Sequence, residues 1–420
     1  MTRIHIIGLS VVANAELGEQ ALLALADADL VIGSKRQLQL IEATLAKKKL
    51  SPNCIELPKL SQLKSLLDSS DAKTAVVLAS GDPLFYGIGR WFSKNFTADQ
   101  LTFYPAVSSV QAGCHALGWS LQDVDVLSLH GRPLNKIRRQ LQIQQKLAIL
   151  TDKHSTPITL AKECDAAGLG ESTLWVCENM GFAQQRIRQF SVAELLTLEF
   201  LDVDPLHITM IETKGRGLVQ PSFPGISDSE YATGKAAGSG MITKREVRLM
   251  VLSFMQPSNG DIIWDLGAGC GGVAVELARW NDRLDVYALE QDPERLNYLK
   301  QNSMKFGVSA NLHPVLGRAS DALTQLPQPN KVFIGGSDGE LAGLLNTVWT
   351  LLPVDGVLVV TAVTDKTKQV LEQFCHSEPR AELECSELAV SRGTLGEDGF
   401  SFQQKRPVMV LKLSKISELT

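Results

Sequence analysis

A glycine-rich stretch in the second half of the chain has the residue types of a nucleoside-binding site. Residues 262–272 read IIWDLGAGCGG, an apolar strand that ends in a glycine-rich turn and then opens a helix. Glycine lets the backbone approach a ligand closely and adopt positive φ without a steric cost. Glu290 ends the next expected strand, where its carboxylate can accept hydrogen bonds from both hydroxyls of a ribose. The pattern predicts a site for a cofactor that contains adenosine.

The glycine loop by itself fits two kinds of cofactor. Gly267, Gly269 and Gly272 have the GxGxxG spacing of nicotinamide sites, and Gly267, Gly269 and Gly271 have the GxGxG spacing of methyltransferases. Asp265 favours the second kind, because a carboxylate beside the loop repels a pyrophosphate but suits the ammonium and sulfonium of S-adenosylmethionine. We therefore predict S-adenosylmethionine as the cofactor, and a nicotinamide-linked oxidoreductase is the alternative.

Polar residues at three strand ends form a second candidate site in the first half. Gly-Asp-Pro is a turn signature, because proline presets φ and aspartate bonds its own backbone. Each element alone is typical of an ordinary turn or helix cap, but three of them in order are more specific. The residues are Gly81, Asp82 and Pro83, then Ser108 and Ser109, and then His130 and Arg132.

The elements that position both sites alternate strands with helices, which predicts an α/β fold with mostly parallel sheets. In the first half we expect strands at 3–7, 29–32, 74–79, 101–104, 125–129, 146–150, 173–176 and 207–211. The second half repeats the pattern from residue 261 onward. It ends in two strands, 381–389 and 407–413, that we expect to form a terminal hairpin. A parallel series that ends in a hairpin is typical of class I methyltransferases.

A stretch rich in Gly, Ser, Pro and Ala separates the two series and predicts a linker at 213–240. The predicted domains are therefore 1–212 and 241–420. Thr243 and Glu246 have the spacing of a capping box, which predicts a helix that runs to about Met255.

Composition excludes several classes of function. The 420 residues are 44% hydrophobic and 21% charged with a net charge of −5, which is ordinary for a soluble enzyme and unfavourable for nucleic-acid binding. The seven cysteines are scattered without a CxxC pair, so we predict neither disulfides nor a metal site. No apolar run approaches the ~20 residues of a membrane span. We predict a cytoplasmic protein without a membrane or nucleic-acid partner.

Several motifs together resemble known families over nearly the whole chain. ADLVIG at 28–33, SGDP at 80–83, VSS at 107–109 and SLHGR at 128–132 are similar to the tetrapyrrole (corrin/porphyrin) methylases, in particular the E-type proteins of cobalamin biosynthesis. MITKREVR at 241–248, the glycine loop and VFIGGS at 332–337 resemble the T-type methyltransferases of the same pathway. The resemblance implies a two-lobed tetrapyrrole methylase domain followed by a Rossmann-like class I methyltransferase domain.

By this resemblance, each domain would bind one S-adenosylmethionine and methylate one meso carbon of a tetrapyrrole. The second domain would also decarboxylate an acetate side chain of the macrocycle, with release of carbon dioxide. In that domain the implied cofactor residues are Thr243, Gly267, Ala268, Gly269, Cys270, Gly271, Glu290 and Ala319. In the first domain they are Gly81, Asp82, Pro83, Ser108 and Ser109. The sequence singles out no catalytic acid or base.

The substrate of such an enzyme is a polycarboxylate, which calls for cations. Lys244, Arg248 and Arg132 are the predicted substrate-binding residues. The family also has a GxGPG-type loop after its first strand, and residues 8–15 read GLSVVANA instead. An N-terminal half that binds tetrapyrrole without catalysis is therefore the alternative, and an RNA methyltransferase is a third reading. Related domains self-associate, so we expect a homo-oligomer.

Overall fold

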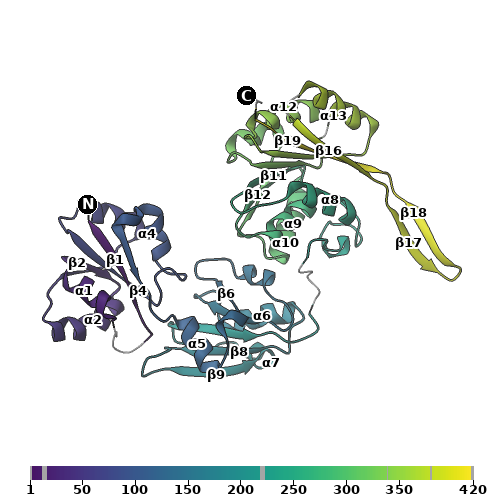
Figure 1. The fold of residues 1–420 in the computed structure, drawn as a ribbon. Coiled ribbons are helices and arrows are strands. Elements are labelled where there is room, and N and C mark those ends of the chain that lie inside the picture. Colours follow the sequence, from purple (N-terminus) through teal and green to yellow (C-terminus); the bar gives the residue numbers. More distant parts are fainter. Residues whose placement is uncertain (1, 12–16, 218–222, 338, 379–380, 418–420) are drawn as a thin grey trace. The chain divides into compact units, whose positions relative to one another are not determined.

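The chain forms two compact units in the computed structural model, which describes residues 2–11, 17–217, 223–337, 339–378 and 381–417 (Figure 1). Unit 1 comprises Met1–Gly131 and Leu141–Leu218, and unit 2 comprises Arg132–Gln140 and Val219–Thr420. No helix among the described residues is long and apolar enough to cross a membrane.

Unit 1 opens with a five-stranded parallel sheet in the order β3-β2-β4-β1-β5. Alternate residues of β4 face opposite sides: Val77 packs toward α3 and α4, whereas Val76 packs toward α1 and α2. The strands are β1 (Arg3–Leu9), β2 (Leu30–Gly33), β3 (Asn53–Glu56), β4 (Thr74–Ser80) and β5 (Leu101–Tyr104). The helices are α1 (Glu19–Ala26), α2 (Lys35–Lys48), α3 (Leu60–Ser69) and α4 (Gly89–Asn95).

The second sheet of unit 1 has the order β6-β7-β10-β8-β9. Only β6 and β7 are parallel, because β10 runs antiparallel to both β7 and β8, and β9 is antiparallel to β8. The prediction of mostly parallel sheets is right for the first sheet and wrong for this one. The elements are β6 (Val124–Ser128), β7 (Lys146–Leu150), β8 (Thr173–Glu178), β9 (Arg186–Ser191), β10 (His207–Glu212), α5 (Ser109–Leu117), α6 (Pro157–Ala166) and α7 (Val192–Leu196).

Unit 2 is built on a seven-stranded sheet in the order β13-β12-β11-β14-β15-β19-β16. The first five strands are parallel, and β19 is antiparallel to β15 and β16, as the terminal-hairpin prediction requires. The strands are β11 (Ile262–Leu266), β12 (Asp285–Glu290), β13 (Leu312–Leu316), β14 (Lys331–Ile334), β15 (Val357–Ala362), β16 (Ala381–Leu388) and β19 (Val408–Lys415).

Helices cover both faces of this sheet. Val251 of α8, Val275 of α9 and Leu299 of α10 belong to the core on one face, and Leu345 of α12 and Leu371 of α13 belong to the core on the other. The helices are α8 (Arg245–Met255), α9 (Gly272–Trp280), α10 (Pro293–Lys305), α11 (Ala319–Ala322), α12 (Leu341–Leu351) and α13 (Asp365–Ser377), and a 3₁₀ helix, Leu134–Arg139, also belongs to unit 2.

The segment between β16 and β19 forms a second hairpin that extends away from the sheet of unit 2 (Figure 1). It consists of β17 (Ser391–Gly396) and β18 (Gly399–Gln404). Leu395 lies opposite Phe400 and Gly393 lies opposite Phe402, so the apolar side chains share one face. Leu395, Phe400 and Phe402 are 70–74% exposed.

Residues 223–240, which were expected to be part of a linker, bond closely to unit 2. The Gly225 and Ile226 amides donate to the Glu276 carboxylate at 2.6 and 3.2 Å, and the Ala232 amide donates to the Asn302 side chain at 2.8 Å. These contacts explain how a segment without apolar periodicity is held in place. The expected capping box is absent: Lys244 is the N-cap of α8, without a side-chain cap.

Candidate active site

The glycine loop of unit 2 needs its glycines. Gly267, Gly269 and Gly271 have φ values of 73°, 57° and 87°, which lie in the left-handed region. A Cβ atom at Gly269 would stand 2.5 Å from the Met241 carbonyl oxygen, and one at Gly267 would stand 2.6 Å from the Gly336 carbonyl oxygen. The loop is therefore clamped between two other segments of the unit.

Glu290 ties the end of β12 to this loop. Its Oε2 accepts a hydrogen bond of 2.8 Å from the Gly269 amide, and its Oε1 accepts one of 2.9 Å from the Asp292 amide. A carboxylate can accept about four hydrogen bonds, so acceptor positions remain for hydroxyl groups of a ligand. Arg295 lies 3.8 Å away and compensates part of the charge.

A pocket of about 330 Å³ opens beside the loop. Seven of the predicted residues line it: Thr243, Lys244, Gly267, Ala268, Gly269, Glu290 and Ala319. Cys270, which is 1% exposed, and Gly271, which is the N-cap of α9, are not among the residues that line it. Met241, Ile242, Gly335 and Gly336 also line the pocket; they lie in the motifs at 241–248 and 332–337, but no role was assigned to them from the sequence. Thr361 and Val363 were missed because their residue types carry no chemical signal.

Cys270 packs beneath the loop as a small core residue. Burial raises the pKa of its thiol, so the reactive thiolate form is disfavoured. Its carbonyl oxygen accepts a hydrogen bond of 2.8 Å from the Asn302 side chain, which anchors the loop to α10.

Asp265 lies under the loop and does not line the pocket. Its Oδ2 accepts a 2.9 Å hydrogen bond from the Ala274 amide in α9, and its Oδ1 has no hydrogen-bond partner among the described residues. Desolvation raises the pKa of this carboxyl group to about 7. The expected direct attraction between Asp265 and the charged groups of the cofactor is therefore replaced by a structural role.

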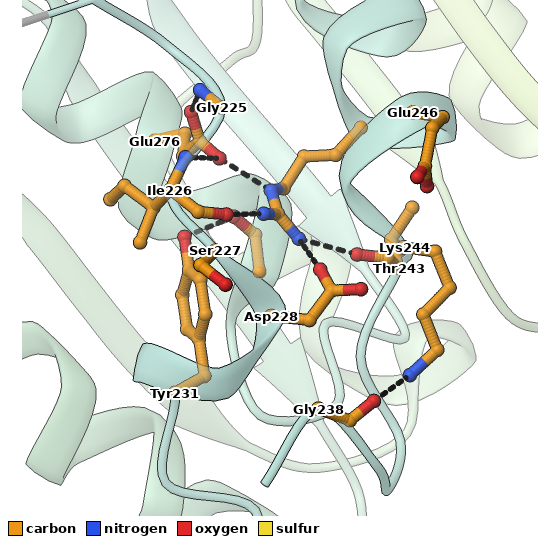
Figure 2. A network of polar contacts seen from close by, with 12 residues as sticks. Gly225, Ile226, Ser227, Asp228, Tyr231, Gly238, Thr243, Lys244, Glu246 and Glu276 are labelled. Carbon is orange, nitrogen blue, oxygen red and sulfur yellow. Dashed lines mark hydrogen bonds and ion pairs between the residues drawn. The ribbon is translucent and has the colours of Figure 1, made fainter. Parts of the chain in front are cut away.

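Arg248 was predicted to bind substrate, and its position is inconsistent with that role. Its side chain is fully buried, with Nε 2.5 Å from Glu276 Oε1 and Nη1 3.1 Å from Asp228 Oδ1. It also donates to the carbonyl oxygens of Thr243, at 2.6 Å, and Ile226 (Figure 2). A guanidinium whose donors are used in this way cannot reach a ligand, and it instead joins residues 226–228 to α8 and α9.

Lys244 remains a candidate contact for a ligand. Its Nζ donates a 2.7 Å hydrogen bond to the Gly238 carbonyl oxygen, and the residue lines the pocket (Figure 2). Arg132 is exposed, begins the 132–140 segment of unit 2, and lines neither this pocket nor the one in unit 1.

Unit 1 has a pocket of about 210 Å³ of its own. Gly81, Ser108 and Ser109 line it, whereas Asp82 and Pro83 do not. Asp82 instead accepts a 2.8 Å hydrogen bond from the Leu84 amide, and the Pro83 carbonyl oxygen accepts one of 2.8 Å from Gly89. These two residues shape the turn beside the pocket, so Gly-Asp-Pro acts here as an ordinary turn sequence.

The walls of this pocket come from both sheets of unit 1. The Ser108 side chain caps α5 in a capping box with Gln111, which fixes the start of that helix. Leu9 is the last residue of β1, and it lines the pocket together with Ser10 and Val11, which follow the strand. The rest of the unusual first loop, residues 12–15, lies outside the described residues. Sequence reasoning missed Arg36, Tyr86 and His207, which lie far apart in the chain.

Comparison with known proteins identifies the class to which this fold belongs. Residues 3–196 match the tetrapyrrole (corrin/porphyrin) methylases, and residues 236–415 match the precorrin methyltransferase domain. Both matches agree with the resemblance stated from the sequence motifs. The chain thus combines two methyltransferase domains of tetrapyrrole metabolism.

A precorrin-6Y C(5,15)-methyltransferase (decarboxylating) of Sinorhizobium sp is 33% identical over 372 residues, which cover 87% of this chain and 86% of the relative. The chain belongs to the family of decarboxylating precorrin-6Y C(5,15)-methyltransferases. Family membership supports S-adenosylmethionine as the methyl donor, in agreement with the prediction from the glycine loop.

Two shorter relatives match part of the chain. A protein of Methanothermobacter thermautotrophicus, described as a probable cobalt-precorrin-6B C(15)-methyltransferase (decarboxylating), is 31% identical over 170 residues, 40% of this chain and 86% of its own length. The crystal structure of a precorrin-6Y C5,15-methyltransferase from Geobacter metallireducens is 32% identical, covers 47% of this chain and 100% of that chain, and has a TM-score of 0.43.

Proposed function

We propose that this chain methylates two meso carbons of precorrin-6Y with S-adenosylmethionine and decarboxylates one of its acetate side chains, as a step of cobalamin biosynthesis. The observation that carries the proposal is the pocket in which the glycine loop and Glu290 meet, in a chain that belongs to this family over both halves. The finer proposal is that each unit binds one methyl donor, and that decarboxylation belongs to unit 2.

The residues around the unit 2 pocket fit the methyl donor. Glu290 has acceptor capacity left for the ribose hydroxyls, and the backbone of Gly267 and Gly269 leaves room beside it. A Cβ atom at Gly336 would meet no atom of the described residues closer than 4.0 Å, and Gly336 lines the pocket, so a side chain there would take up space that the donor needs. Ala319, at the start of α11, would lie along the adenine.

Bound S-adenosylmethionine supplies an electrophilic methyl group to an electron-rich carbon of the macrocycle. The protein therefore needs no nucleophile of its own, in keeping with the buried Cys270. The task of the loop, Glu290 and the Met241–Lys244 wall is to hold donor and acceptor carbon in line and to exclude water. Lys244 is the candidate contact for a substrate carboxylate in this unit.

In unit 1, Gly81, Ser108 and Ser109 are the proposed donor-binding residues. The competing proposal is that unit 1 binds tetrapyrrole without transferring a methyl group, since its first loop departs from the GxGPG pattern. We also propose a cytoplasmic homo-oligomer without a nucleic-acid partner, on the basis of the net charge of −5 and the exposed apolar face of the β17–β18 hairpin.

Mass spectrometry of the product formed from precorrin-6Y tests the proposal with the full chain. The wild-type chain should add two methyl groups and release one carbon dioxide. Gly269→Arg should abolish decarboxylation and one methylation, because the side chain would strike the Met241 carbonyl and fill the loop. Gly260→Arg is the matched control, since Gly260 also has a positive φ but no atom of the described part of the chain lies within 4 Å of its Cβ position.

The same assay separates the two readings of unit 1. Gly81→Val should remove the second methylation only, because its Cβ would stand 2.9 Å from the Ser108 Cα. Gly118→Val is the control, because Gly118 has the same φ of 65° and none of the atoms that the structure describes lies within 4 Å of its Cβ position. A doubly methylated product from a folded Gly81→Val chain would favour unit 2 as the only catalytic unit.

A further inference from the structure

Arg36 points a guanidinium into the pocket of unit 1. It belongs to the first turn of α2, and its Nη2 donates a hydrogen bond of 2.9 Å to Ser80 Oγ at the end of β4. Ser80 Oγ also accepts one of 3.1 Å from the Gln37 side chain. The guanidinium is thus held at the pocket wall by a neutral hydroxyl, which leaves most of its donors for another partner.

No acidic side chain balances this charge within the described residues. The described lining of the pocket contains neither Asp nor Glu, and Arg36 takes part in no ion pair of 4.0 Å or less among the described residues. His207, the other basic residue of the lining, has its ring nitrogens 3.0 Å from Thr151 Oγ1 and 2.7 Å from the Asp204 carbonyl oxygen. Burial lowers the pKa of His207, which favours the neutral ring.

The stability of α2 does not explain the arginine either. The positive end of a helix dipole favours acidic side chains, yet the first turn of α2 contains Lys35 and Arg36 and no acid. Lys35 differs from its neighbour, because its side chain is 81% exposed and lies 4.0 Å from Glu56. Arg36 is thus a half-buried cation without an ion-pair partner among the described residues, and its position is unfavourable for the helix dipole. An anionic group of a ligand would compensate this charge.

We propose that Arg36 binds a carboxylate of the ligand in the unit 1 pocket. An arginine suits this role, since its planar fork forms paired hydrogen bonds with a carboxylate. The inference rests on the proposed function, which offers two sources of that group: the methionyl carboxylate of the donor, and an acetate or propionate side chain of the tetrapyrrole. In either case Arg36 fixes the orientation of a reactant relative to Gly81 and Ser108.

Calorimetric titration of the full chain with Gly269→Arg tests the inference at unit 1 alone. The probes are S-adenosylmethionine, its decarboxylated analogue, and uroporphyrin as a stable polycarboxylated tetrapyrrole. Arg36→Gln should raise the Kd of the carboxylate-bearing ligand at least about tenfold, and Arg36→Lys should raise it less. Lys35→Gln is the matched control, because it removes the same charge one residue away and outside the pocket lining.

The arms identify the source of the carboxylate. A weaker Kd for S-adenosylmethionine with an unchanged Kd for its decarboxylated analogue assigns Arg36 to the donor. A weaker Kd for uroporphyrin with an unchanged donor Kd assigns it to the macrocycle, and this arm decides the matter even if unit 1 binds no donor. Unchanged Kd values for every probe that binds would overturn the inference and leave the proposed function intact. Failure of all probes to bind the Gly269→Arg chain would overturn the inference together with the proposal that unit 1 binds a donor or a tetrapyrrole.

Discussion

The Glu290 carboxylate accepts a hydrogen bond of 2.8 Å from the Gly269 amide, and this contact sets the glycine loop against the end of β12. The same carboxylate is 4% exposed and faces the pocket. One side chain therefore both shapes the loop and offers acceptors to a ligand.

Replacing Glu290 by Gln should weaken the binding of S-adenosylmethionine at unit 2. The amide keeps one acceptor oxygen but loses the charge and the second oxygen, so we expect a loss of about 2 kcal/mol, or roughly thirtyfold in Kd. Isothermal titration measures it, and Glu294→Gln on the exposed face of α10 is the control. Equal affinity of wild type and Glu290→Gln would remove Glu290 from the donor site.

Replacing Arg248 by Met should destabilise unit 2 strongly. The substitution leaves Glu276 buried without its cation and leaves Asp228 with Arg392 as its remaining cation, at 3.1 Å, so we expect a cost of about 3–5 kcal/mol. Scanning calorimetry should find a lower midpoint for unit 2, whereas Arg245→Met on the exposed side of α8 should change the free energy of unfolding by less than about 0.5 kcal/mol. Similar midpoints for the two variants would contradict the network as a source of stability.

Asp265 makes the stability of unit 2 depend on pH. An aspartate titrates near 3.9 in an unfolded chain, and desolvation raises the pKa of Asp265 to about 7 in the fold. Between these values the folded chain holds a proton that the unfolded chain has lost, so stability falls as the pH rises through this window. The full cost, on the order of 4 kcal/mol, is present above pH 7.

Asp265→Asn removes that titration and can keep the Ala274 hydrogen bond through its amide oxygen. The unfolding temperature of Asp265→Asn minus that of the wild type should therefore increase as the pH rises from 5 to 8. Asp355→Asn, at an exposed turn, serves as the control. A constant difference between Asp265→Asn and wild type across this range would mean that Asp265 is ionised throughout.

The apolar face of the β17–β18 hairpin should support self-association. Phe400 and Phe402 are 74% and 70% exposed, so both rings contact solvent in the isolated chain. Exposed apolar patches of this kind mark surfaces that bind another protein. The double substitution Phe400→Ser and Phe402→Ser should lower the mass found by sedimentation, and Thr394→Ala with Gln403→Ala on the opposite face should not. An oligomer that survives the phenylalanine substitutions must use another surface.

Much of the fold could be predicted because apolar periodicity marks strands that are buried on both faces. The parallel strands β11, β12, β14 and β15 of unit 2 are cases of this kind, whereas the edge strand β13 is only partly buried. The edge strands β3 and β9 were missed, since NCIE and RIRQFS are mostly polar and owe their structure to the neighbouring strand. The β17–β18 hairpin is almost entirely exposed and gives no burial signal.

The candidate site was predicted as far as its residues are local in sequence. Glycine spacing and a following acid identify the loop and Glu290, but nothing near Arg248 in the chain reveals that Glu276 and Asp228 occupy its donors. Arg36 was missed for the same reason, because the pocket that it lines is assembled from strands of two sheets. The residues next to an arginine in the sequence do not show whether its guanidinium binds another side chain of the protein or a ligand.

The attachment of residues 223–240 to unit 2 determines where the chain could be divided into two fragments that fold. A chain that begins at residue 241, the start of the motif-bearing region, would lose the amides that bond Glu276 and Asn302 and the carboxylate of Asp228 beside Arg248. Such a fragment would fold poorly for reasons unrelated to catalysis. A division that keeps residues 223–240 with the second half preserves these bonds. Two separately expressed halves should therefore be divided before residue 223.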